Sequence, residues 1–169
     1  MKAKEVMTKQ PQCCISDTSL VTVARMMIEC DCGAIPVVGD LDARMPIGVI
    51  TDRDMVIRAI AVSQNPLELT ARDCMTTPAF TVTEDTDLDD CIDLLEERQV
   101  RRVLVVDNRG ACCGIIAQAD VASHAPKRTA GELLRGVSLP TPDSKAKTIG
   151  EPHAKQRRQE LASHDEVPG

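Results

Sequence analysis

Apolar residues recur along the first part of the chain with the spacing of a buried helix face. From Leu20 to Ile28 they stand at i, i+3, i+4, i+7 and i+8, which predicts a helix with one face in a core. We expect Thr18 to cap its start and Gly33 to mark its end. The apolar run Ala34–Val38 then predicts a strand. Its proline cannot donate to a sheet ladder and therefore predicts an edge position, or a rim that faces something other than another strand.

A second apolar stretch ends in a polar turn. Residues 48–54 read Gly-Val-Ile-Thr-Asp-Arg-Asp. The apolar part predicts a short strand, and the polar part predicts a turn into a helix that runs to Ala61. The turn therefore places a hydroxyl, a carboxylate and a guanidinium at the start of a helix.

The chain repeats this pattern further along. Met-Thr at 75–76 matches Met-Thr at 7–8, an offset of 68 (75 minus 7). The offset falls to 66 (114 minus 48) where residues 114–120 repeat residues 48–54, because the loop before them is shorter. A shift confined to a loop is typical of a structural repeat, so the sequence predicts two copies of one unit.

The repeat and a change in composition divide the chain into four parts. We expect repeat one at 1–62, a linker at 63–72 and repeat two at 73–125. Residues 126–169 carry five of the ten prolines, with alternating charges and little apolar periodicity. This composition predicts a mobile charged C-terminal tail, or a tail that docks on a partner or on the body.

Composition and charge exclude several classes of protein. With 169 residues and 43% hydrophobic content the chain can bury a core, and no apolar run is long enough to predict a membrane span. A formal charge of -6 and a single aromatic residue argue against a nucleic-acid binder, which relies on positive charge and on rings that stack on bases. The start of the chain lacks the pattern of a secretory leader, so we expect a cytoplasmic protein.

Eight cysteines raise the question of a metal or redox site. They are Cys13, Cys14, Cys30, Cys32, Cys74, Cys91, Cys112 and Cys113. Their layout lacks the Cys-x-x-Cys spacing of a structural zinc site, and the three histidines lie scattered late in the chain. We therefore expect reduced cysteines that fill the core or lie exposed, with a metal or redox role as the weaker alternative.

These motifs together resemble the cystathionine-β-synthase (CBS) domain, and the two copies resemble a tandem CBS pair, or Bateman module. The motifs are the Met-Thr start, Asp-Thr-x-Leu before a helix, the Ile-Pro-Val-Val strand and the turn at 48–54, within residues 3–125. The chain is similar to standalone bacterial CBS-pair proteins, including the hypoxic-response type. The resemblance implies an α/β fold (α+β in stricter use) with two β-α-β-β-α repeats packed sheet to sheet as one module. It also implies ligand clefts between the repeats and a disc-shaped homodimer.

The turn at residues 48–54 allows two interpretations. The Thr51 hydroxyl beside free backbone N–H groups suits a phosphate, Asp54 suits the two hydroxyls of a ribose, and Arg53 suits phosphate charge. Thr-x-x-Asp is also close to a capping box, with aspartate in place of glutamate. The spacing alone leaves both open. The resemblance favours the first, because CBS domains that bind adenosine nucleotides carry Ser or Thr and Asp at these places.

The second copy departs from this pattern. Ala117 stands where Thr51 stands in the first copy and can neither cap a helix nor hold a phosphate, whereas Asp120 still suits a ribose. The resemblance implies that Arg101 and Arg102 reach phosphates in the cleft. The alternative is that they only compensate the dipole of the preceding helix. We expect the first cleft to be occupied more tightly than the second.

The expected ligand is an adenine nucleotide, one per chain. AMP is the first candidate, ATP and ADP are alternatives, and S-adenosylmethionine and NAD rank below them. Ile15, Ile35 and Pro36 are the apolar residues that we expect against adenine, and for each of them a place in the core is the alternative.

We expect a non-enzymatic regulatory or sensor module, because no pair of nucleophile and base is visible in the sequence. Its expected partners are the nucleotide, a second copy of the chain and an unidentified regulated protein. The alternative is a ligand-free dimerising scaffold that acts through its tail or its cysteines.

Overall fold

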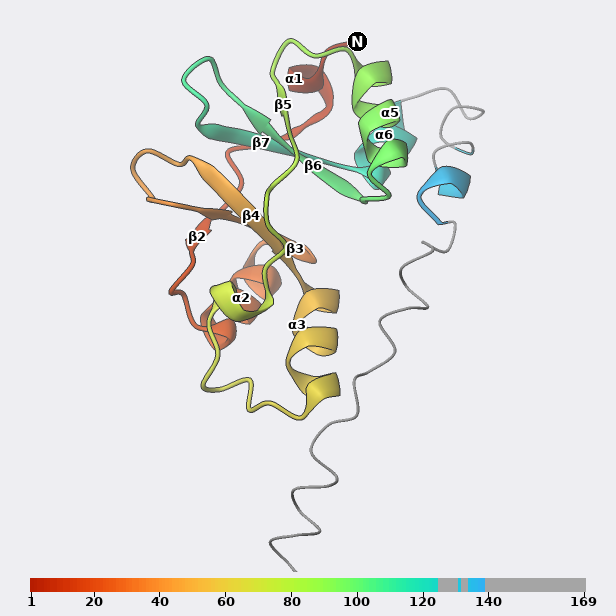
Figure 1. Cartoon of the computed structure of the whole chain (residues 1–169). Helices are drawn as coiled ribbons and strands as arrows, with labels where there is room; N and C mark the ends of the chain where they lie inside the picture. The colour runs from red at the N-terminus through yellow and green to blue at the C-terminus, as the bar shows by residue number, and fades with distance from the viewer. Residues whose placement is uncertain (125–130, 132–133, 139–169) are drawn as a thin grey trace, which may run out of the picture. The chain divides into compact units, whose positions relative to one another are not determined.

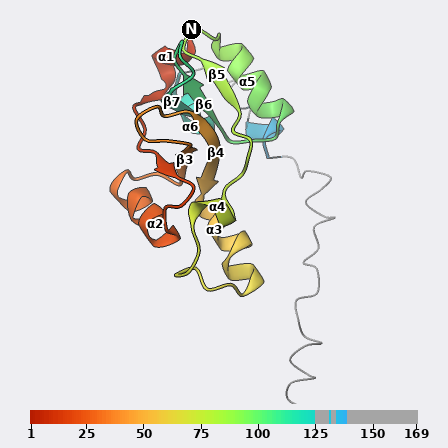
Figure 2. The ribbon, with the colours of Figure 1, turned by 60° about the vertical axis from the view of Figure 1, so that its left-hand side comes forward.

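The computed structural model describes residues 1–124, 131 and 134–138 of the chain. Two small sheets meet in the middle of the molecule, and helices lie on their outer sides (Figures 1 and 2). The elements in chain order are α1 (Ala3–Val6), β1 (Thr8–Lys9), β2 (Cys14–Ile15), α2 (Leu20–Glu29), β3 (Ala34–Val38), β4 (Pro46–Thr51), α3 (Asp52–Arg58), the short 3-10 helix η1 (Ile60–Val62), α4 (Ala71–Cys74), β5 (Thr81–Thr83), α5 (Leu88–Glu97), β6 (Arg102–Val106), β7 (Cys112–Ala117) and α6 (Gln118–His124). Both repeats contain the predicted β-α-β-β-α order, so the predicted fold class is confirmed.

The first sheet has the order β2-β3-β4, with β2 parallel and β4 antiparallel to β3. The edge alternative for residues 34–38 was therefore wrong, because β3 is the middle strand, whereas the rim alternative describes Pro36. Pro36 fits there for two reasons. Its partner Val49 makes its own backbone bonds to Thr76, on the side away from β3. On the other side, the short β2 pairs only with Val37 and Val38.

The ends of α2 also differ from the prediction. Ser19 caps the helix instead of Thr18, because the Ser19 hydroxyl accepts a hydrogen bond from Thr22 N at 3.1 Å. The helix ends at Glu29, four residues before Gly33. Asp31 takes the left-handed backbone conformation after the helix, with φ of 48°, which a glycine adopts more readily.

The second sheet has the order β1-β7-β6-β5 and includes a strand from the other end of the chain. Thr8 and Lys9 of β1 pair antiparallel with Ile115 and Gly114 of β7. The first repeat has a reduced counterpart of this pairing, a single bridge between Val49 and Thr76. Each repeat thus begins by adding backbone to the sheet of the other.

The short helices α1 and α4 complete this exchange. Ala3 N donates to Thr86 O at 2.9 Å, and 68 residues later (71 minus 3) Ala71 N donates to Thr18 O at 2.8 Å. Both helices contribute fully buried side chains to the core of the other repeat. Neither core is complete without residues from the opposite repeat.

Three apolar clusters stabilise the module. One lies between the first sheet and α2 and α3, and a second lies between the second sheet and α5 and α6. The third, the inter-sheet cluster, joins the two sheets and consists of Val38, Leu104 and Cys112 with Cys13, Ile15, Val49, Ala79 and Ile115 packed against them. The sheets therefore contact each other through side chains from both repeats, as the predicted sheet-to-sheet packing requires.

Part of the predicted mobile tail is packed against repeat two. Val137 is 6% exposed and belongs to the same cluster as α5, and Gly136 O accepts a hydrogen bond from Gln99 Nε2 at 2.9 Å. Residues 134–138 therefore follow the alternative in which the tail docks on the body. The rest of the predicted tail, apart from Gly131, lies outside the described residues.

Gly48 and Gly114 mark the two places where an exchanged segment crosses a sheet. A Cβ atom on Gly48 would lie 2.7 Å from Thr76 O and 3.2 Å from Met75 Sδ, and one on Gly114 would overlap the Met7 side chain. Thr76 cannot retreat easily, because its backbone exchanges hydrogen bonds of 2.8 and 3.0 Å with Val49.

We predict that Gly48→Ala lowers the free energy of unfolding by about 1–3 kcal/mol, since the new methyl group meets a fixed backbone oxygen. Gly39→Ala is the matched control, because its Cβ atom would find no neighbour closer than 3.8 Å. Urea denaturation of both variants measures the difference. Equal stability of the two would contradict the close crossing at Gly48.

Candidate functional site

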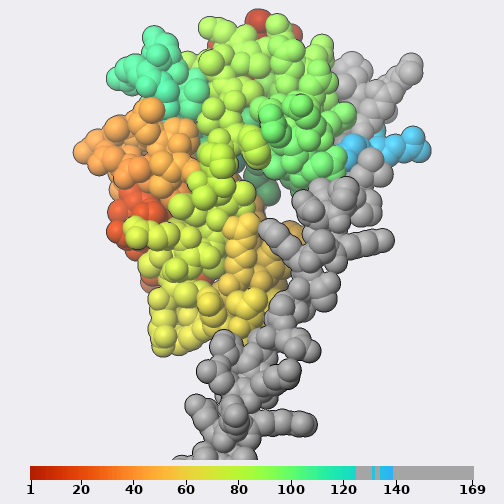
Figure 3. Space-filling model, in the orientation of Figure 1, coloured from red at the N-terminus to blue at the C-terminus, as the bar shows by residue number. Residues whose placement is uncertain are grey.

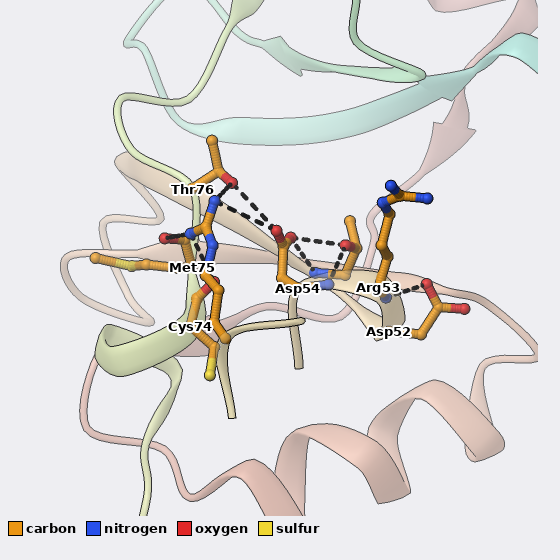
Figure 4. A network of polar contacts seen from close by, with 8 residues as sticks. Asp52, Arg53, Asp54, Cys74, Met75 and Thr76 are labelled. Atoms are coloured by element: carbon orange, nitrogen blue, oxygen red, sulfur yellow. Dashed lines mark hydrogen bonds and ion pairs between the residues drawn. The ribbon is translucent and has the colours of Figure 1, made fainter. Parts of the chain in front are cut away.

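The turn at Thr51 forms a capping box at the start of α3. Thr51 N and Thr51 Oγ1 donate to Asp54 Oδ2 at 3.0 and 2.6 Å, and Asp54 N donates to Thr51 Oγ1 at 3.1 Å (Figure 4). The alternative interpretation of Thr-x-x-Asp as a helix cap is therefore realised in the structure.

Asp54 is 9% exposed, and its second oxygen also has internal partners. Arg58 Nη2 lies 3.4 Å from Asp54 Oδ1, and the Thr76 hydroxyl donates to the same oxygen at 3.5 Å. Arg58 also donates to Cys74 O at 2.9 Å and to Met75 O at 2.6 Å. A ribose at Asp54 would have to share or displace these bonds. Sequence reasoning missed Arg58, although its i, i+4 spacing from Asp54 was a usable signal.

Asp52 and Arg53 are exposed at the same turn. Arg53 N donates to Asp52 Oδ1 at 2.7 Å, and the Arg53 side chain extends away from Asp54 in Figure 4. The Arg53 guanidinium takes part in no hydrogen bond or ion pair with the residues that the structure describes. It is thus available to a ligand.

Arg102 approaches this turn from the other repeat. A Cβ atom on Gly33 would lie 2.9 Å from Asp52 Oδ2 and 3.4 Å from Arg102 Nη2, so both charged groups flank the bare backbone of Gly33. Asp52 N also donates to Gly33 O at 3.2 Å. We call Gly33, Thr51, Asp52 and Arg102 the cross-repeat site. Asp52 was not among the predicted binding residues, although it lies within the motif.

The second copy of the turn keeps half of the capping box. Ala117 N donates to Asp120 Oδ2 at 2.7 Å, and the hydroxyl contacts of the first copy are missing, as the alanine predicts. Gln118, the counterpart of Asp52, donates from its backbone N to Arg101 O at 3.1 Å. Its side-chain Oε1 is buried without a hydrogen-bond partner among the described residues. Arg101 itself is exposed.

The three predicted adenine contacts fall on two faces of the first sheet. Ile15 packs against the inter-sheet cluster, and Pro36 lies on the same face of β3 as Val38, which belongs to that cluster. Ile35 is 1% exposed in the core under α2. For Ile35 the structure therefore shows the alternative of a place in the core, and a contact with adenine stays a prediction for Ile15 and Pro36.

Two surface hollows lie away from the Thr51 turn. One, of about 480 Å³, is lined by residues of α1 and β1 with Glu84 and Cys113. The other, of about 350 Å³, lies between the loops around Arg44 and Arg109. The cross-repeat site is thus defined by its converging polar groups and by the glycine between them. Sequence reasoning had identified neither hollow.

The described residues contain neither a cluster of metal ligands nor a membrane-spanning helix. In residues 1–124, 131 and 134–138 no three histidine, cysteine or acidic side chains are placed to bind a metal ion together. No helix within these same residues combines the length and the apolar composition of a membrane span.

The CBS domain model matches residues 3–60 and 71–127. The chain belongs to the CBS domain family. The two matches lie in the two repeats of the fold, so the protein is a tandem CBS pair. CBS pairs are regulatory modules.

Hypoxic response protein 1 of Mycobacterium tuberculosis is 31% identical over 138 residues, which cover 82% of this chain and 94% of that protein. The solved structure of Hypoxic Response Protein I with two coordinated zinc ions has a TM-score of 0.65 at 31% identity and covers 75% of this CBS pair and all of that chain. CBSX2, solved in complex with AMP, has a TM-score of 0.61 at 26% identity, covering 73% of this chain and 95% of that one. An uncharacterized protein of Methanopyrus kandleri is 36% identical over 106 residues, 63% of this chain, which spans only 53% of that protein's length.

We predict that Thr51→Ala lowers the free energy of unfolding by about 1 kcal/mol, because α3 loses the hydroxyl that accepts from Asp54 N. Thr51→Ser keeps the hydroxyl and serves as the control. Urea denaturation followed by circular dichroism measures both. A Thr51→Ala variant as stable as Thr51→Ser would show that the capping box contributes nothing.

Proposed function

We propose that this CBS pair is a non-enzymatic regulatory module, acting in the cytoplasm, that binds an adenine nucleotide at the cross-repeat site. AMP is the first candidate, with ADP and ATP as alternatives and S-adenosylmethionine and NAD below them. The approach of Arg102 in repeat two to Gly33 and Asp52 in repeat one carries the proposal. A ligand held there touches both repeats and can report its presence through their packing.

Charge at the site supports a phosphate. The guanidinium groups of Arg53 and Arg102 are free of ion pairs within the described residues, and guanidinium binds phosphate oxygens through paired hydrogen bonds. Gly33 leaves the space between Asp52 and Arg102 without a side chain. Ile15 and Pro36 provide apolar surface on the same face of the first sheet. The complex of CBSX2 with AMP supports an adenine nucleotide as the ligand.

In the proposed mode, Arg53 and Arg102 bind the phosphate and Thr51 adds its hydroxyl. A carboxylate of the turn, Asp54 as predicted or the more exposed Asp52, accepts from the ribose. In the second copy, Asp120 and the buried Gln118 Oε1 offer acceptors, and Arg101 offers charge. Ala117 removes the hydroxyl, which makes the second site the weaker one.

We predict that Arg102→Gln weakens AMP binding by about tenfold or more, since a charge-assisted hydrogen bond is lost. Isothermal titration calorimetry with AMP, ADP, ATP, S-adenosylmethionine and NAD measures the affinities. Arg109→Gln is the matched control, because this exposed arginine pairs with Asp107 in a distant loop. Arg102 is preferred to Asp54 as the test because Asp54 also supports the capping box, so its removal would mix binding with stability.

The outcomes separate the two functions considered. No heat from any of the five compounds would refute the nucleotide sensor. The ligand-free scaffold would then be favoured. The hydrogen bonds that Thr51 and Asp54 make to each other support that second candidate, because these groups need no ligand as a partner. Unchanged AMP binding in Arg102→Gln would place the ligand outside the cross-repeat site.

We also propose that the module forms a homodimer through α3 and η1. Val56, Ile57, Ile60 and Val62 are 51%, 44%, 60% and 41% exposed, and the segment that carries them is yellow in Figure 3. Large apolar side chains exposed together on one short segment are typical of an interface.

We predict that Ile60→Asp converts the dimer into a monomer, because a carboxylate in an apolar interface loses its hydration. Light scattering coupled to size-exclusion chromatography measures the mass. Ile28→Asp is the control, since Ile28 is 81% exposed on α2. A mass unchanged in Ile60→Asp, or a monomeric starting protein, would contradict this interface.

A further inference from the structure

Two cysteines from different repeats meet between the sheets. Cys13 precedes β2, and Cys112 begins β7. Cys112 is 1% exposed within the inter-sheet cluster, and the half-buried Cys13 packs against that cluster. The Cys112 thiol donates to Gly114 O at 3.7 Å, and the Cys13 thiol packs beside it in the same cluster. Both are free thiols.

Arg44 fixes this pair from a third segment, the loop between β3 and β4. Its Nε donates to Cys112 O at 3.0 Å, and its Nη2 donates to Pro11 O at 2.8 Å. Pro11 O also accepts from Cys13 Sγ at 3.5 Å, and Cys112 N donates to Arg44 O at 2.8 Å. Across the described residues no carboxylate lies within ion-pair distance of this guanidinium, so its positive charge acts on the thiols.

The surroundings give the two thiols opposite acidities. The neighbouring Cys112 thiol and the charge of Arg44 lower the pKa of Cys13, against the effect of burial. The neighbouring Cys13 thiol and burial raise the pKa of Cys112. Burial raises the pKa of Cys14 and of Cys91 to about 11. Cys13 is therefore the thiol of this pair whose surroundings favour the thiolate, which is the reactive form.

A path for a small oxidant lies beside the pair. The hollow of about 350 Å³ is lined by Arg44, Cys112, Gln10 and Cys113, among other residues of the two loops. The hollow is larger than a hydroperoxide molecule, and it reaches Cys112, beside which Cys13 packs.

We propose that Cys13 and Cys112 are a peroxide-sensitive dithiol whose disulfide joins the two repeats. The Cys13 thiolate attacks one oxygen of the hydroperoxide, the O–O bond breaks, and the leaving hydroxide or alkoxide takes a proton. Cys13 is then a sulfenic acid. Cys112 loses its proton and attacks the Cys13 sulfur, the S–O bond breaks, and the departing hydroxide leaves as water. Two thiols are oxidised by two electrons in total, and the peroxide is reduced.

The first step prepares the second. The negative charge of the Cys13 thiolate is one cause of the raised pKa of Cys112. Conversion of Cys13 to a neutral sulfenic acid removes that charge, so Cys112 loses its proton more easily. The disulfide would link β7 to the segment before β2 and hold the two sheets at one spacing. This proposal needs no nucleotide, so its failure and that of the proposed ligand site are distinguishable.

The test treats the full, reduced chain with hydrogen peroxide, blocks the remaining thiols with iodoacetamide and maps tryptic peptides by mass spectrometry. We expect a cross-linked pair of the peptides 10–25 and 110–127, with fragment ions that place the bond between Cys13 and Cys112. Cys13→Ser and Cys112→Ser should each abolish this pair, while Cys113→Ser, the neighbouring control, should retain it. Because the wild-type fragments locate the bond directly, the result does not depend on a variant that fails to fold.

A second measurement follows the rate of iodoacetamide labelling at neutral pH in the absence of peroxide. We expect Cys13 to react at least several-fold faster than Cys30, although Cys30 is the more exposed thiol, because burial and the nearby Cys32 and Glu29 raise the pKa of Cys30. Arg44→Gln should slow the labelling of Cys13 selectively. Oxidation that yields only Cys13 sulfinic acid, a bond to Cys14 or Cys113, or faster labelling of Cys30 would overturn the proposal.

Discussion

The backbone pairing of Thr76 with Val49 across Gly48 connects the two repeats. It brings the start of repeat two onto the sheet of repeat one, where Arg58 binds the carbonyls of Cys74 and Met75. Arg58 also faces Asp54, so the order of the Thr51 turn depends on a segment from the other repeat. The candidate ligand site is thus built on the exchange as well as on its own motif.

Much of the fold was predictable from periodicity and from the offset of 68, because each helix face and strand is a local pattern. The exchange was not predictable. In the structure Gly48 contacts Met75 and Gly114 contacts Met7, one such pair in each sheet. A contact between two residues far apart in the sequence produces no periodic pattern, so it could not be recognised from the sequence. The edge position of Pro36 was mispredicted for a related reason. The sequence shows that proline cannot donate, and only the structure shows that a short neighbouring strand leaves it room.

The candidate site shows the same limit. Thr70 and Asp73 repeat the Thr-x-x-Asp spacing and form the same capping box at α4, where the Thr70 backbone N–H lowers the pKa of Asp73. The spacing therefore reports a helix start, and what distinguishes the Thr51 turn is the approach of Arg102. Strand alternation could have separated Ile35 from Pro36, since neighbouring residues of a strand face opposite sides.

The exchange of segments between the repeats also affects when each part of the chain can fold during synthesis. The helix α1 is synthesised before the other described elements, yet its partners Glu84 and Thr86 and the strand β7 emerge only after repeat one is complete. Repeat one in turn waits for Ala71 and Cys74 to close its core. During translation the N-terminal residues therefore remain undocked beside a growing chain, and folding of both repeats converges late, when the second sheet leaves the ribosome.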